Sequence, residues 1–136
     1  MVECVTLMLV IRDAQLREFE RVAVRRFAAR MTVHVEKAWP EECRRLGLAF
    51  TAARVQAAVE RAMGHGVVSE YDIGRFVHLV FALDNLEFDR EEWAARVLQN
   101  RARPAGARID ALWENVRRQL ERRARWTSSA ARIELG

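Results

Sequence analysis

The side chains best suited to catalysis or metal binding are few in this chain, and their spacing matches none of the usual site motifs. The 136 residues include three histidines and two cysteines, which are His34, His65, His78, Cys4 and Cys43. The cysteines lack the C-x-x-C spacing of a metal or redox site, and two thiols make no disulfide framework. A Cys43 nucleophile paired with His34 or His65 has no supporting motif either. We therefore expect reduced thiols, as is usual in the cytoplasm.

The carboxylates, like the histidines and cysteines, match no metal-binding or catalytic motif. A metal ion at His34 would need partners such as Glu70 and Asp72, but both acids also suit the first turn of a helix, where the helix dipole favours negative charge. Adjacent Glu41 and Glu42 would need burial to separate their pKa values for acid–base catalysis, and nothing around them predicts that burial. We expect structural roles for Glu70 and Asp72, and a partly buried His34 that donates to a carbonyl or a carboxylate.

Glycine motifs of the phosphate-binding or hydrolase type are also missing. The segment G-H-G at residues 64–66 is too short for a phosphate loop, and no G-K-[ST] follows it. No G-x-S-x-G occurs in the chain. We therefore expect a protein that is not an enzyme and that binds no metal or other cofactor.

Positive charge is concentrated at the C-terminal end. The formal charge is +4, and residues 101–136 hold nine Arg and four acids, whereas residues 1–100 hold 14 basic and 15 acidic side chains. Of the 23 basic residues, all but Lys37 are Arg. A GC-rich genome explains this bias, although Arg also suits bidentate contacts with phosphate. Composition alone leaves both explanations open.

The basic end also carries tryptophans, and this combination predicts a surface that binds a protein. Exposed Trp beside Arg is typical of interface hot spots. The residues expected to contact a partner are Trp113, Arg117, Arg118, Arg122, Arg125 and Trp126. Nucleic acid is a weaker candidate, because adjacent arginines point to different sides of a helix. The second helix of the helix–turn–helix-like segment at residues 51–79 also begins with acids, where a reading helix would meet DNA.

Capping residues and helical spacing predict the elements that hold these side chains. We expect Asp13 to cap a first helix that ends near Trp39. Pro40 then begins a short second helix, which is closed by Gly47. Thr51 is expected to cap a third helix, which ends close to the G-H-G segment.

Two capping boxes predict the helices that follow. Ser69 with Asp72 begins a fourth helix that runs to about Leu83, and Ser69 therefore has a structural role. This helix is apolar on more than one side, which is typical of a central, buried helix. Asp89 with Glu92 begins a fifth helix. The sixth helix has a single apolar stripe formed by Ile109, Leu112, Trp113, Val116 and Leu120.

Together these elements predict an all-α fold, a compact single-domain bundle of five to six helices over residues 1–125. Cys4–Val10 is rich in Val and Leu without helical spacing, and we expect it to form a short extended N-terminal arm. Residues 126–136 are small, polar and basic, and we expect them to form a flexible C-terminal tail.

We expect no targeting or membrane segment. The apolar start of the chain lacks a basic n-region and a small-residue cleavage site, so it does not predict a signal peptide. The longest apolar run, Phe76–Leu83, has eight residues, whereas a membrane helix needs about 20. The expectation is a cytoplasmic protein with no membrane partner.

A set of helix-core and capping residues occurs in an order that matches one bacterial family. The set comprises I-R-D-A-Q at residues 11–15, Phe19, Phe27, Met31, His34, Pro40 and Gly47, then A-M-G-H-G-V-V-S-E-Y-D-I at residues 62–73, Phe76, Phe88 and Trp93. Over residues 8–120 the chain resembles small helical proteins of Gram-negative bacteria that are encoded beside type VI secretion effectors and their spike-tip proteins.

The resemblance implies an accessory protein of an effector operon. Such a protein would be an adaptor or co-chaperone that holds a secreted effector near the spike, or an immunity protein that blocks a toxin. The partner would be the effector or another product of the same operon. The family supplies no functional residues to carry over, and the Arg-rich end after Leu120 lies outside the pattern.

Overall fold

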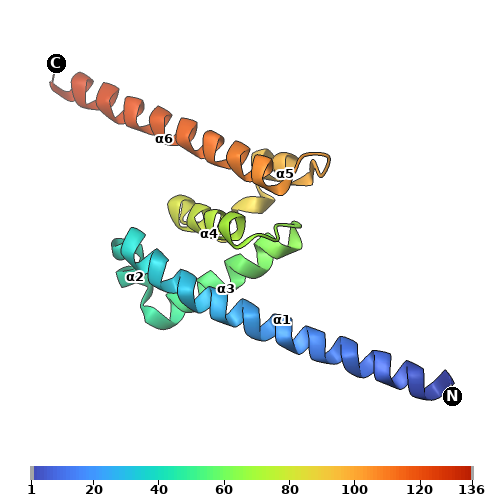
Figure 1. Cartoon of the computed structure of the whole chain (residues 1–136). Coiled ribbons are helices and arrows are strands. Elements are labelled where there is room, and N and C mark those ends of the chain that lie inside the picture. Colours follow the sequence, from blue (N-terminus) through green and yellow to red (C-terminus); the bar gives the residue numbers. More distant parts are fainter. Residues whose placement is uncertain (1, 136) are drawn as a thin grey trace. The chain divides into compact units, whose positions relative to one another are not determined.

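The structure is a computed structural model that describes the backbone of residues 2–135 and the side chains of Glu18 and residues 20–127. Within that part the chain is all-α, with six α-helices, one 3-10 helix and no strand (Figure 1). The elements are α1 (Val2–Ala38), α2 (Pro40–Leu46), α3 (Leu48–Gly64), α4 (Glu70–Leu83), η1 (Phe88–Arg90), α5 (Glu92–Gln99) and α6 (Ala105–Leu135). The predicted helical fold is confirmed.

The chain divides into two compact units, Met1–Val59 and Glu60–Gly136. The first unit holds α1, α2 and most of α3, and the second holds the end of α3 and the elements from α4 to α6. The expected domain at residues 1–125 and tail at residues 126–136 stay predictions. α6 is helical on both sides of that boundary, as far as Leu135.

α1 is longer than predicted. It begins at Val2, so Cys4–Val10 is helical where an extended arm was expected, and Asp13 lies inside the helix and does not cap it. The prediction relied on the Val content of this segment, but β-branched residues lower helix propensity only slightly. Each residue added to an existing helix gains a backbone hydrogen bond, which outweighs that preference. The side chains of Asp13 and Phe19 lie outside the described residues.

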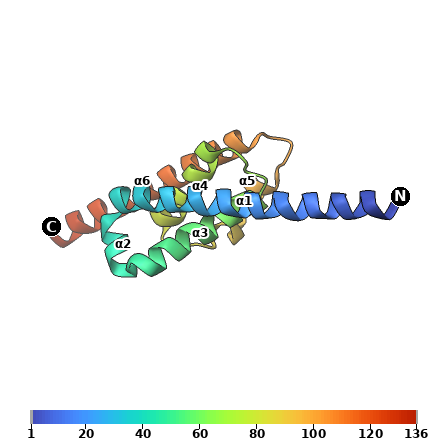
Figure 2. The ribbon, with the colours of Figure 1, turned by 60° about the horizontal axis from the view of Figure 1, so that its bottom comes forward.

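α2 links α1 to α3 as a short helix between two turns (Figure 2). α1 ends directly before Trp39, and Pro40 occupies the first turn of α2, as predicted. Gly47 closes α2 with φ +82° and ψ 161°, a region that only glycine adopts without strain. Its N–H donates to the carbonyl of Cys43 at 2.9 Å. The predicted helix end at Gly47 is confirmed.

Thr51 does not cap α3, in contrast to the prediction. The turn at Gly47 lets the next helix begin at Leu48, and the N–H of Thr51 already donates to the Gly47 carbonyl at 2.9 Å. The Thr51 side chain is fully buried, and its hydroxyl donates to the carbonyl of Cys43 at 3.5 Å. A hydroxyl in the first turn therefore anchors α3 to α2.

Among the described side chains of α1, the buried residues follow one helical face. They are Phe27, Ala28, Met31 and Val35. His34, which was expected to be partly buried, is exposed. The reason is its register, because Val35 lies four residues after Met31 and takes the inward position, with no exposed surface.

α4 has the caps and the burial that the sequence predicts. The Ser69 hydroxyl accepts the N–H of Asp72 at 3.1 Å and donates to the Asp72 carboxylate at 2.9 Å. Glu70 and Asp72 lie in the first turn. The buried residues of this helix are Ile73, Gly74, Phe76, Val77, Leu79, Val80 and Phe81. They lie on more than one side of the helix, which confirms that α4 is the apolar, buried helix of this unit.

The second predicted capping box is wrong. Asp89 lies in η1, is buried, and pairs with other side chains, and the residue before α5 is Glu91, which makes no side-chain capping bond. In the part of α6 whose side chains are described, the buried residues are Arg108, Ile109, Leu112 and Val116. Leu120, predicted to continue this stripe, is 49% exposed.

Candidate functional site

The residues predicted to bind a partner all lie on α6, but they do not form one surface. Trp113 is half-buried, whereas Arg117, Arg118, Arg122 and Arg125 are exposed. Trp126 is 76% exposed. Every described residue from Glu121 to Thr127 is exposed, so the described part of α6 has no buried residue after Val116.

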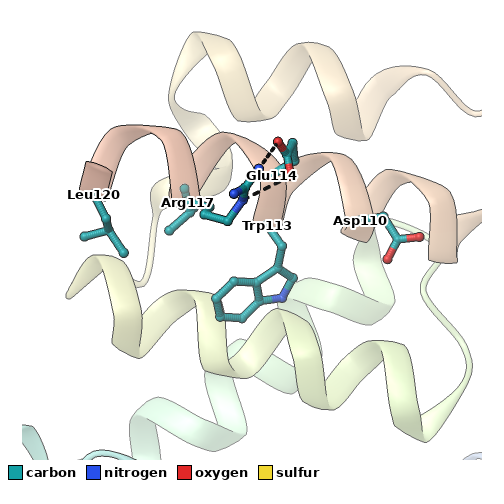
Figure 3. A pocket seen from close by; sticks show the side chains of 6 residues that line it. Asp110, Trp113, Glu114, Arg117 and Leu120 are labelled. Carbon is teal, nitrogen blue, oxygen red and sulfur yellow. Dashed lines mark hydrogen bonds and ion pairs between the residues drawn. The ribbon is translucent and has the colours of Figure 1, made fainter. Parts of the chain in front are cut away.

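Trp113 and Arg117 line an open hollow on α6. The hollow has a volume of about 480 Å³, and its lining residues are Asp110, Trp113, Glu114, Val116, Arg117 and Leu120. Figure 3 shows the Trp113 indole pointing from α6 toward α4, with Leu120 on the same side. The indole Nε1 is buried and has no hydrogen-bond acceptor among the described residues. The floor is therefore apolar and the rim is charged.

Arg117 is held on this rim by two carboxylates of its own helix. Its Nη2 donates to Glu114 Oε1 at 2.7 Å, and its Nη1 donates to Glu121 Oε1 at 3.2 Å. The hydrogen bond from Arg117 lowers the pKa of Glu114, and the same bond raises the pKa of Arg117. Arg118 and Arg125 pair with the same two acids, at 3.5 and 4.0 Å. These exposed pairs contribute little to stability, but they neutralise much of the predicted basic patch.

Trp126 belongs to a different side of α6. Residues three and four apart are neighbours on a helix, so Trp126 lies beside Arg122 and Arg123. Both arginines are exposed and have no ion pair among the described residues. The sequence grouped Trp126 with Arg117, Arg118, Arg122 and Arg125. Of these arginines, Arg122 lies beside Trp126 on the helix, together with Arg123, which was not in the predicted set.

The other candidate residues are the histidines, cysteines and carboxylates, of which the side chain of Cys4 lies outside the described residues. Within the described part of the chain, no group of three or more His, Cys, Asp and Glu side chains is arranged to hold a metal ion. Cys43 Sγ lies 3.8 Å from the carbonyl of Val35. Burial raises the pKa of this thiol, which keeps it protonated at neutral pH. None of the helices in this described part has the length and apolarity to cross a membrane.

A buried charge cluster around Asp89 was missed by the sequence reasoning. The carboxylate is 5% exposed and accepts hydrogen bonds from Arg61 Nη2 at 2.5 Å and from His65 Nε2 at 2.7 Å. Burial by itself raises the pKa of Asp89, but the hydrogen bonds and charges of Arg61 and His65 outweigh burial and hold this pKa below its usual value. The sequence signal was present in Phe88-Asp89, but it was interpreted as a helix cap.

His65 also contacts the aromatic core. Its ring centroid lies 6.0 Å from that of Phe76, which in turn lies 5.0 Å from Phe88. Phe76 and Phe88 have no exposed surface. The cluster therefore links the end of α3 to η1 through both a charge pair and ring packing.

Arg108 is a second buried cation that the sequence reasoning did not single out. It is 5% exposed. Its Nη1 donates to the carbonyl of Leu98 at 2.8 Å and to the carbonyl of His65 at 3.1 Å. These carbonyls lie at the C-terminal ends of α5 and α3, where the helix dipole is negative. The sequence signal that could have predicted this burial was a basic residue directly before Ile109, on the apolar side of α6.

Comparisons with known proteins identify no family for this chain. No protein-family model matches the chain. No curated protein and no solved structure matches it significantly.

Proposed function

We propose that the protein is a non-enzymatic protein-binding factor whose contact surface lies on α6. The observation that carries this proposal is the hollow around Trp113. Its apolar floor continues onto Leu120, which is 49% exposed. An exposed Leu beside a half-buried Trp and charged side chains has the composition of an interface centre with a polar rim.

The unpaired indole supports the same proposal. A buried donor without an acceptor costs free energy, and native structures contain few of them. Trp113 Nε1 is such a donor among the described residues. Because Nε1 has almost no exposed surface, a partner could supply the missing acceptor only if its binding shifts the indole.

A second apolar contact lies farther along α6. Trp126 is 76% exposed beside Arg122 and Arg123. Trp and Arg are the residue types enriched in interface hot spots. These arginines would favour an acidic surface on the partner.

The ion pairs of α6 favour a protein partner over nucleic acid. Phosphate binding needs arginines that are free to pair with phosphates. Arg117, Arg118 and Arg125 are instead shared with Glu114 and Glu121. Carboxylates on the same face would also repel the phosphate backbone.

The partner that we propose is a secreted effector, or another product of the same operon. This part of the proposal depends on the resemblance to proteins encoded beside type VI secretion effectors. In that setting the chain would act in the cytoplasm as an adaptor or co-chaperone. Blocking a toxin as an immunity protein is the alternative role.

The test is co-expression of the chain with each product of the neighbouring genes, followed by co-purification. Leu120→Glu places a charge in the hollow, and Val68→Glu is the matched control because Val68 is 85% exposed in a loop outside α6. We expect Leu120→Glu to weaken the complex at least about tenfold, in the range of a hot-spot change, and Val68→Glu to leave it unchanged.

Two outcomes would contradict the proposal. One is that no neighbouring product forms a stable complex, and the other is that both variants bind as tightly as the wild type. Circular dichroism of each variant would verify that the helices are retained. Rescue of cells from a co-expressed toxin would distinguish the immunity role from the adaptor role.

A further inference from the structure

The loop after α3 brings two arginines to one glycine. α3 ends in a glycine-based cap, in which the N–H of Gly66 donates to the Met63 carbonyl at 2.9 Å and the N–H of Val67 donates to the Ala62 carbonyl at 3.2 Å. Gly66 has φ +81°, as this cap requires. The cap leaves the carbonyls of Gly64 and His65 without partners from the helix itself.

Arg101 and Arg108 donate hydrogen bonds to those two carbonyls. Arg101 Nη2 donates to the Gly64 carbonyl at 3.3 Å, and Arg108 Nη1 donates to the His65 carbonyl at 3.1 Å. Both guanidinium groups therefore approach the loop. A Cβ atom on Gly66 would lie 3.1 Å from Arg101 Nη1 and 3.9 Å from Arg108 Nη2. The two nitrogens thus face the same point beside Gly66.

Neither guanidinium has a carboxylate partner among the described residues. Arg108 is 5% exposed, bonds only carbonyl groups, and has a buried Nε without an acceptor. Buried charges in proteins are usually paired or bound to ions. The nearby Asp89 does not serve this role, because Arg61 and His65 already occupy both of its oxygens.

We infer that Arg101, Arg108 and the loop at Gly66 form a binding site for a small phosphate-type oxyanion. A guanidinium presents a planar set of donors that matches phosphate oxygens. Two of them at one point supply positive charge that the carbonyl groups offset only in part and that no carboxylate among the described residues neutralises. Gly66 has the positive φ that the cap requires, and a Cβ atom there would lie 3.1 Å from Arg101 Nη1, the end of an exposed side chain. The site is separate from the α6 hollow and does not depend on the proposed function.

Inorganic phosphate and pyrophosphate are the probes for this site. Each is titrated into the full chain by calorimetry at constant ionic strength, with chloride replaced by the probe, and the melting temperature is measured in parallel. We expect saturable binding and a matching rise in melting temperature, since a ligand that binds the folded state stabilises it.

Arg101→Gln tests the assignment without disturbing the core, because Arg101 is exposed. We expect it to weaken binding about tenfold or more, as for the loss of a charged hydrogen bond. Arg103→Gln is the matched control on the same exposed connection and should leave binding within about twofold. No saturable binding by the wild type, or equal binding by the wild type and Arg101→Gln, would overturn the inference.

Discussion

Asp89 forms a tertiary charge pair where its position in the sequence predicted a helix cap. Its position before α5 suits a helix cap, yet the carboxylate is buried between Arg61 and His65. Two charge-assisted hydrogen bonds offset the cost of burying this charge. A single hydrogen bond from a backbone N–H at a helix end would stabilise the carboxylate less than these two bonds do. Asp89 therefore does not cap α5.

Asp89→Asn is predicted to destabilise the protein at neutral pH and to flatten its stability between pH 5 and pH 3. The folded-state pKa of Asp89 lies below its usual value. Its stabilising contribution is therefore complete above the unfolded pKa of about 3.9 and is lost as the pH falls through the folded pKa. The loss at pH 7 should be about 1–3 kcal/mol, measured by urea unfolding.

Glu92→Gln is the control for this prediction. Glu92 is also a carboxylate paired with an arginine, Arg96, but its side chain is 79% exposed. Exposed pairs are worth about 0–1 kcal/mol. If both variants lost the same stability, or if Asp89→Asn kept the wild-type dependence on pH, the buried pair would not have the role assigned to it.

At the scale of elements, glycines set where helices end. Gly47 has φ +82° and ψ 161° with open space around its Cβ position. Gly64 lies inside the last turn of α3, also with open space and without a positive φ. The two positions differ in backbone conformation and not in crowding.

Alanine is therefore predicted to have opposite effects at these two positions. Gly47→Ala should cost about 1–3 kcal/mol, because only glycine adopts this backbone region without strain. Gly64→Ala should stabilise the chain by about 0.5–1 kcal/mol, because alanine loses less conformational freedom in a helix. Thermal unfolding of both variants measures the difference, and equal effects would contradict the explanation.

At the scale of the whole molecule, the net charge of +4 does not show which arginines are free of an acidic partner. The excess lies in residues 101–136, and there Glu114 and Glu121 pair with three of the exposed arginines. Arg108 is buried against carbonyl groups. Counting charges along the chain does not reveal these pairings.

Duplex DNA is accordingly predicted to bind no more tightly than about 10⁻⁶ M at physiological salt, the range of non-specific binding. Fluorescence anisotropy between about 50 and 200 mM salt tests this. Tight binding that persists at the upper salt concentration would show that the protein binds nucleic acid through more than non-specific charge attraction. It would then contradict the protein partner that we propose.

Much of the fold follows from sequence signals that act over a few residues. Pro40, Gly47, Ser69 and Asp72 set helix ends where expected, because capping depends on atoms within one turn. The apolar pattern of α4 predicted its burial, because a helix that is apolar on several sides must be covered. The predictions for His34 and for the start of α1 were wrong. For His34 the predicted inward position was off by one residue, and for α1 the weak preference of Val for extended structure was given too much weight.

Less of the candidate sites than of the fold could be predicted from the sequence. It identified Trp113 and Arg117 as contact residues, and both line the hollow on α6. It could not pair Asp89 with Arg61, 28 residues away, or bring Arg101 and Arg108 to Gly66. The sequence by itself determined the helices and most of their ends, because those depend on neighbouring residues. Only the tertiary structure decided which charges are buried together, because that depends on which distant helix ends meet.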